Sequence, residues 1–202
     1  VFGTAFAALF LGSILFLTQV WGWSILQAGF GVVPGPMAVG LLAPRVGRLA
    51  GRIGQRPILV VGGLLYASSG LYRLAMLGPE SAYLRDYFPS MVLSGLGVAC
   101  VFPQLSSVAA QALPAGRAGV GGAVTQAVRQ FGGTFGVALT IAFIGAAGTA
   151  VADFDGVWWL VAIGGVATTV LALPMRTASL RRPAPLPSAV VTPPLGARTG
   201  TS

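Results

Sequence analysis

Six long apolar runs alternate with short breaks that contain nearly all of the charged residues. The runs cover about residues 1–17, 28–43, 57–78, 87–110, 119–147 and 156–175. A helix that crosses a bilayer needs about 17–25 mostly apolar residues. Only 8% of the residues are charged, against about 25% in a soluble domain. The sequence therefore predicts an all-α integral membrane protein with six transmembrane helices.

The breaks carry opposite charge on the two sides of the predicted membrane. Arginines fill the breaks at residues 44–56, around Arg117 and after residue 175. The four carboxylates all lie in the other breaks: Glu80, Asp86, Asp153 and Asp155. Short loops rich in basic residues stay in the cytoplasm. This pattern predicts a multi-pass protein of the cell membrane with the arginine breaks and both ends of this segment in the cytoplasm.

Aromatic residues gather on the carboxylate side of the pattern. They are Trp21, Trp23, Trp158, Trp159, Tyr83 and Tyr87. Amphipathic rings favour the headgroup layer, so we expect an aromatic belt at the outer surface. In the second run, Pro34 and Pro36 predict a bent or broken helix.

Two domains follow from the composition. Residues 1–175 are expected to form the six-helix bundle, and the Pro-rich residues 176–202 a disordered cytoplasmic tail. The chain begins inside an apolar run, without Met or a basic segment. We therefore expect a fragment whose N-terminal part is missing.

The fifth run carries a small and polar stripe with one cation in it. Its members are spaced 4, 3, 4 and 3 residues apart and share one helical face: Gly122, Gln126, Arg129, Gly133 and Gly136. Arg129 falls near the middle of the hydrocarbon, where a charge costs at least about 2.5–3.5 kcal/mol. It should face protein or water, either contacting substrate or a partner half, or tying helix ends together through carbonyls.

A second polar stripe lies on the fourth run: Ser94, Gly97, Val101, Gln104, Ser107 and Gln111. We expect the serines to form hydrogen bonds between helices. We expect Gln104 to line a cavity, because Pro103 should kink the helix and free a carbonyl beside it. Arg73 lies five residues before the end of the third run, and we expect it to extend to the outer headgroups.

Composition also excludes several classes of function. The chain has no His and one Cys, so a zinc site lacks its usual ligands, and no metal or cofactor is expected. A membrane enzyme with a serine nucleophile commonly needs a His base, and an enzyme is not expected. The net charge of +8 comes from arginines at the ends of apolar runs. No nucleic-acid partner is expected from that arrangement.

The break after the second run reads PRVGRLAGRIGQRP, and its glycines indicate a loop with a tight turn. It resembles the cytoplasmic loop motif between the second and third helices of a half in the major facilitator superfamily. The motif residues are Gly47, Arg48, Arg52, Gly54 and Arg56. The motif's usual acidic position falls on Gly51 here, which removes a charge from any gating relay.

Two further stretches extend the resemblance. Gln19 to Pro34 is similar to the first external loop in the C-terminal half of 14-helix drug:proton antiporters, and Arg129 to Ala138 to the fifth helix of that half. The resemblance implies six helices that form one half of a major facilitator fold. It implies that the first, second, fourth and fifth helices line a cavity. The candidate cavity residues are Arg129, Gln126, Gln104, Ser94 and Gln19.

The same resemblance implies the activity and the partners. The expected activity is export of hydrophobic or cationic drugs, or of a secreted metabolite, driven by proton entry. The expected partners are the lipid bilayer, the N-terminal half of the same transporter, a small-molecule substrate and protons. A self-contained channel or a homodimeric small transporter is the alternative.

Overall fold

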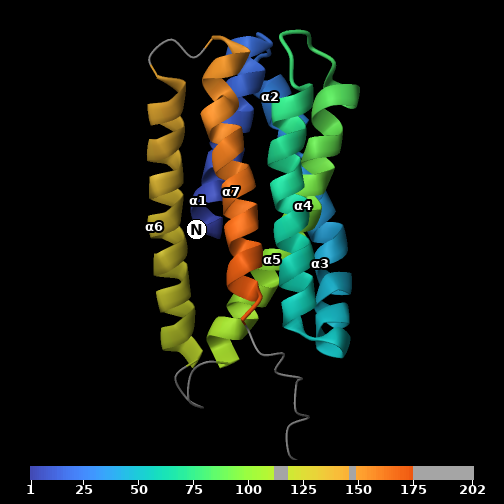
Figure 1. Ribbon diagram of the computed structural model, residues 1–202, viewed down its shortest axis with the longest axis vertical. Helices are drawn as coiled ribbons and strands as arrows, with labels where there is room; N and C mark the ends of the chain where they lie inside the picture. The colour runs from blue at the N-terminus through green and yellow to red at the C-terminus, as the bar shows by residue number, and fades with distance from the viewer. Residues whose placement is uncertain (112–117, 146–148, 175–202) are drawn as a thin grey trace, which may run out of the picture.

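The computed structural model describes residues 1–111, 118–145 and 149–174, which form a bundle of long helices (Figure 1). The α-helices are α1 (Phe2–Leu15), α2 (Ile25–Val32), α3 (Pro34–Ile53), α4 (Gln55–Met76), α5 (Phe88–Gln111), α6 (Ala118–Ile144) and α7 (Asp155–Ala172). Two π-helical turns, η1 (Phe16–Val20) and η2 (Tyr83–Tyr87), and a 3-10 turn, η3 (Val151–Phe154), flank them.

Six helical stretches are long and apolar enough to cross a membrane. They confirm the predicted fold class, an all-α membrane protein with six spans, and no strand occurs among the described residues. Arg117 and the Pro-rich segment 176–202 lie outside the described residues.

The second span is broken at Val33, as the proline pair predicts. Ser24 begins α2 with reciprocal hydrogen bonds: its Oγ accepts from the Gln27 backbone N–H (3.2 Å), and its own N–H donates to Gln27 Oε1 (3.0 Å). This pairing satisfies two backbone donors that a helix start leaves free. Pro34 then opens α3, where a missing N–H costs nothing.

The prediction of a loop over residues 45–56 is wrong, because α3 continues to Ile53. Hydropathy detects only the apolar part of a helix. The helix α3 continues beyond its apolar part, with arginines exposed on its surface. Arg45 donates to the Leu41 carbonyl one turn earlier (2.9 Å). The chain reverses at Gly54 alone, whose φ of 92° is in the left-handed region that favours glycine.

The helices pack as a series of neighbours in which α3 contacts α5, α5 contacts α4, α4 contacts α7, α7 contacts α1 and α1 contacts α6. Glycines let backbones touch within this series. A Cβ at Gly165 would lie 2.6 Å from the Gly63 carbonyl oxygen, joining α7 to α4, and one at Gly95 would lie 2.7 Å from the Gly35 carbonyl oxygen, joining α5 to α3. Lipid tails are as apolar as the helices, so such close van der Waals packing is a main source of helix association in membranes.

The aromatic residues at the carboxylate end form an internal cluster more than a surface belt. Trp158 and Tyr87 are fully buried, and only Trp159 is largely exposed. The Phe16 ring contacts Trp158, and the Tyr87 ring contacts Trp21. Trp21 Nε1 also donates to the Gly78 carbonyl (3.0 Å). The expected belt at the headgroups is therefore wrong for Trp158 and Tyr87, because both rings point between helices and fill the bundle.

Candidate functional site

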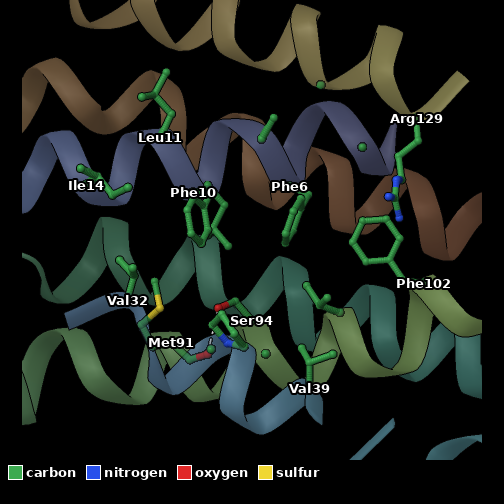
Figure 2. A pocket seen from close by; sticks show the side chains of 18 of the residues that line it. Phe6, Phe10, Leu11, Ile14, Val32, Val39, Met91, Ser94, Phe102 and Arg129 are labelled. Carbon is green, nitrogen blue, oxygen red and sulfur yellow. Dashed lines mark hydrogen bonds between the residues drawn. The ribbon is translucent and has the colours of Figure 1, made fainter. Parts of the chain in front are cut away.

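A cavity of about 760 Å³ lies between α1, α3, α5 and α6 (Figure 2). Its walls are mainly apolar and aromatic, with Phe6 and Phe10 from α1 facing Met91 and Ser94 from α5. Neither α4 nor α7 contributes to the lining. The resemblance implies the same four lining spans. Drug-sized ligands bind in cavities of about 300–1,000 Å³, so this volume suits a small molecule.

Among the residues that the structure describes, Arg129 is the only charged one that lines this cavity. It extends from α6 toward α5, and its Cζ lies 5.4 Å from the centre of the Phe102 ring (Figure 2). Gly3 of α1 packs closely on the backbone here, because a Cβ there would lie 3.3 Å from the Arg129 carbonyl oxygen. Among the described residues, no carboxylate pairs with Arg129. Within the part of the chain that the structure describes, the guanidinium has one aromatic contact and its N–H groups meet no acceptor.

A second cavity of about 450 Å³ continues on the other side of Arg129, between α1, α5 and α6. Arg129 and Phe102 line both cavities, so this pair marks the boundary between them. Gln126 lines the second cavity, one turn before Arg129 on α6. The α6 stripe thus faces open space as one surface, and only Gly136 packs on α1 instead, beside Thr4.

Ser94 lines the first cavity, where its hydroxyl donates to the Met91 carbonyl of its own helix (2.9 Å). Gln104 is buried and does not line either cavity described above, and Gln19 is exposed on η1, away from both. The structure therefore brings Arg129 and Ser94 to one cavity, Arg129 and Gln126 to the next, and leaves Gln104 and Gln19 apart.

The stripe on α5 turns mainly toward α4, which explains the place of Gln104. A Cβ at Gly97 would lie 2.9 Å from the Gly62 carbonyl oxygen on α4. Further along, Gln55 Nε2 of α4 donates to Ser107 Oγ (2.9 Å), which is the expected hydrogen bond between helices. α5 continues as one helix through Pro103.

The loop-motif residues lie together where α3 meets α4. Arg48 and Arg52 are exposed on the last turns of α3, and Arg56 on the first turn of α4. Gly47 has open space around it. No described carboxylate pairs with these arginines, so the group presents a basic surface at this end of the bundle.

Sequence reasoning missed Arg73, which is only 1% exposed. Its Nε donates to Ser90 Oγ (3.0 Å) and its Nη1 to Ser13 Oγ (2.7 Å), which join α4 to α5 and α1. Its Cζ lies 5.0 Å from the Tyr87 ring centre and 4.7 Å from the Trp158 ring centre. The expectation that Arg73 reaches the outer headgroups is wrong, because its helical face points into the bundle.

A signal for this burial was present in the spacing along α4. Tyr66, Gly70 and Arg73 are four and three residues apart, so they share one helical face, and all three are buried. The serines that accept from Arg73 donate their own protons to carbonyls about one turn earlier, Ser13 to Leu9 within α1 and Ser90 to Tyr87 at the end of η2. Their lone pairs are thereby left to accept from the guanidinium.

Six apolar helical stretches long enough to cross a membrane, with a cavity of this size between them, define the class as a multi-pass membrane protein. Comparison with curated proteins finds relatives whose names describe drug resistance or export. The chain is 35% identical over 124 residues to the multidrug resistance protein Stp of Mycobacterium tuberculosis, covering 61% of this chain and 22% of that protein. It is 30% identical over 131 residues to the cephamycin export protein CmcT of Amycolatopsis lactamdurans, covering 65% of this chain and 27% of that protein.

A third relative is the tetracenomycin C resistance and export protein of Streptomyces glaucescens, 36% identical over 137 residues, covering 64% of this chain and 24% of that protein. The chain is homologous to bacterial drug exporters of the major facilitator type. The matched segment spans about a quarter of the length of these relatives. No family model and no solved structure matches the chain.

Proposed function

We propose that this chain is the C-terminal six-helix half of a proton-coupled exporter of small molecules. The observation that carries the proposal is the first cavity, which four spans line on one side of the bundle while α4 and α7 pack behind them. In major facilitator transporters two such halves meet around a binding site near the middle of the membrane. The relatives, whose names describe multidrug or antibiotic resistance and export, support the same activity.

The partner half is proposed to cover the face formed by α3 and α6. These helices stand at the two ends of the packing series. Of the six spans, the two that contain α3 and α6 have the smallest share of buried residues. Large apolar side chains are exposed along both, such as Met37 and Leu41 on α3 and Phe131 and Phe135 on α6. A homologous half with an apolar surface fits this face and encloses the cavity.

The proton-carrying group is proposed to come from the other half. Transporters relay protons mainly through Asp, Glu and His inside the membrane. Of the four carboxylates, Glu80, Asp153 and Asp155 lie at the ends of spans. Asp86 is buried on η2, where Arg85 Nε lies 2.7 Å from its Oδ1. No carboxylate lines either of the two cavities.

Residues 1–202 reconstituted alone into vesicles are expected to show no saturable substrate movement when a pH gradient is imposed, because half of the cavity and the proton carrier are absent. The full-length protein in matched vesicles should accumulate a fluorescent drug against its concentration gradient, and a protonophore should abolish this. Gradient-driven transport by the isolated chain would overturn the half-transporter proposal in favour of a homodimer. Failure of the full-length protein with every drug tested would overturn the export proposal.

The proposed orientation places the α3–α4 turn in the cytoplasm and the α4–η2 segment outside. Cysteines introduced singly at Gln55 and Ser81 test it in full-length protein carrying Cys100→Ala, which removes the only cysteine of this segment, a buried one. In intact cells a membrane-impermeant maleimide should label the Ser81→Cys variant only. The Gln55→Cys variant should become labelled after the cells are opened. Labelling of both from outside would contradict the orientation.

A further inference from the structure

We propose that the first cavity selects small aromatic carboxylates, with the ligand carboxylate on Arg129 and its ring among the cavity phenylalanines. This inference rests on the proposed function and names its substrate class. It departs from the cationic drugs that the family resemblance leads one to expect. The charge that this chain gives the cavity is the reason, since Arg129 is the only charged residue in the described lining.

The position of Arg129 makes an unpaired charge there costly. It lies 11 residues after the start of α6, or about 17 Å along the helix at about 1.5 Å per residue. That depth is within the hydrocarbon, where a lone charge is expensive and an opposite charge is worth most. An anion in the cavity therefore gains more from Arg129 than it would at a surface.

The geometry around the guanidinium suits a planar acid. Phe102 contacts the guanidinium of Arg129 at 5.4 Å from its ring centre, and the cation is held beside that ring. The N–H groups have no described acceptor. An arginine fork can donate two parallel hydrogen bonds to one carboxylate. A ligand carboxylate can thus take the free edge without displacing any described protein contact.

The rest of the lining suits an aromatic body. Phe6 and Phe10 project from α1 into the same space, opposite Met91 of α5 (Figure 2). Aromatic rings and a thioether make favourable contacts with a flat apolar ring. Two other polar side chains line the cavity, Ser94 and Gln130, and both are neutral. Nothing in the described lining stabilises a cationic ligand by charge.

Binding of three matched ligands to purified full-length protein tests the inference: 1-naphthoate, 1-naphthamide and 1-naphthylmethylammonium, which share a ring system and differ in charge. Hydrogen bonds to charged groups contribute more than neutral ones. We expect 1-naphthoate to bind at least about tenfold tighter than the amide and the ammonium compound, as measured by calorimetry.

Variants then locate the preference. Arg129→Gln should remove the advantage of 1-naphthoate and leave the dissociation constant of the amide within about twofold. Arg129→Lys should keep part of the advantage, because it retains charge without the planar fork. The matched control is Thr134→Ala on the same helix, which is exposed and lines neither cavity, and it should keep the preference.

Equal affinity of the wild-type protein for the three ligands would overturn the inference without using any variant, as would tighter binding of the ammonium compound. An Arg129→Gln variant that loses all three ligands equally would also overturn it, since Arg129 would then pair with a carboxylate of the other half. Drug export by the same preparation separates the two proposals. If the protein exports drugs without a charge preference, the proposed substrate class is wrong and the proposed export function stands.

Discussion

Arg73→Ala is expected to destabilise the protein more than any other single arginine substitution in the described spans. The change removes a fully buried side chain, both hydrogen bonds to Ser13 and Ser90, and the contacts with the Tyr87 and Trp158 rings. Truncating a large buried side chain to alanine costs about 3–5 kcal/mol. The thermal midpoint in detergent should fall by about 10 °C or more.

Two further variants separate the causes of this loss. Arg73→Met fills most of the space without a charge and should lose much less stability, since buried charges are often replaceable by apolar residues of similar volume. Arg129→Ala is the comparison variant, because Arg129 is exposed and its guanidinium contacts only a ring among the described residues. Its thermal midpoint should not fall, because the substitution removes an unpaired charge from the hydrocarbon. A thermal midpoint of Arg73→Ala equal to that of the wild type would contradict the role assigned to Arg73.

Gly165→Val is expected to prevent normal packing of α7 on α4. Its Cβ would lie 2.6 Å from the Gly63 carbonyl oxygen and 2.8 Å from Ala67 Cα. These are backbone atoms and cannot turn aside as a side chain can, so the helices must separate. Overpacking in a core costs about 1–3 kcal/mol and sometimes more, and here the upper end applies. Yield of monodisperse protein after detergent extraction should fall several-fold.

The matched control for this substitution is Gly47→Val on α3. A Cβ at Gly47 meets nothing within 4 Å, and valine has a slightly higher helix propensity than glycine. The control should therefore extract as well as the wild type. If Gly165→Val and Gly47→Val behave alike, the close contact between α4 and α7 does not determine stability.

The sequence predicts the six spans well because an apolar run of membrane length has few alternatives in a bilayer. Span ends were less predictable. The helix α3 continues past the apolar segment to Ile53, since arginine and leucine are good helix formers in water as well. The break at Val33 followed from the two prolines, whose effect on a helix is local and does not depend on tertiary packing.

The candidate site was only partly predictable. Helical spacing placed Gln126 and Arg129 on one face of α6, and that face lines the two cavities. Spacing does not say which neighbouring helix a face meets. The α5 stripe with Gln104 therefore could not be placed from the sequence, and in the structure it turns toward α4. The two intramembrane arginines show the same difficulty. Arg73 is enclosed and Arg129 exposed, and this difference arises from the faces that other helices cover.

The backbone contacts at glycine have a mechanical consequence. Among the described residues, four helix pairs are joined in this way: α4 with α7 at Gly165, α3 with α5 at Gly95, α5 with α4 at Gly97, and α1 with α6 at Gly136, whose Cβ would lie 3.0 Å from the Thr4 carbonyl carbon. Sliding one helix past another needs a compliant layer of side chains between them, and these pairs lack one at the contact. We therefore expect the six spans to rock as one stiff body. The motion that opens or closes the cavity should then occur at the outer surface of this body and not between its helices.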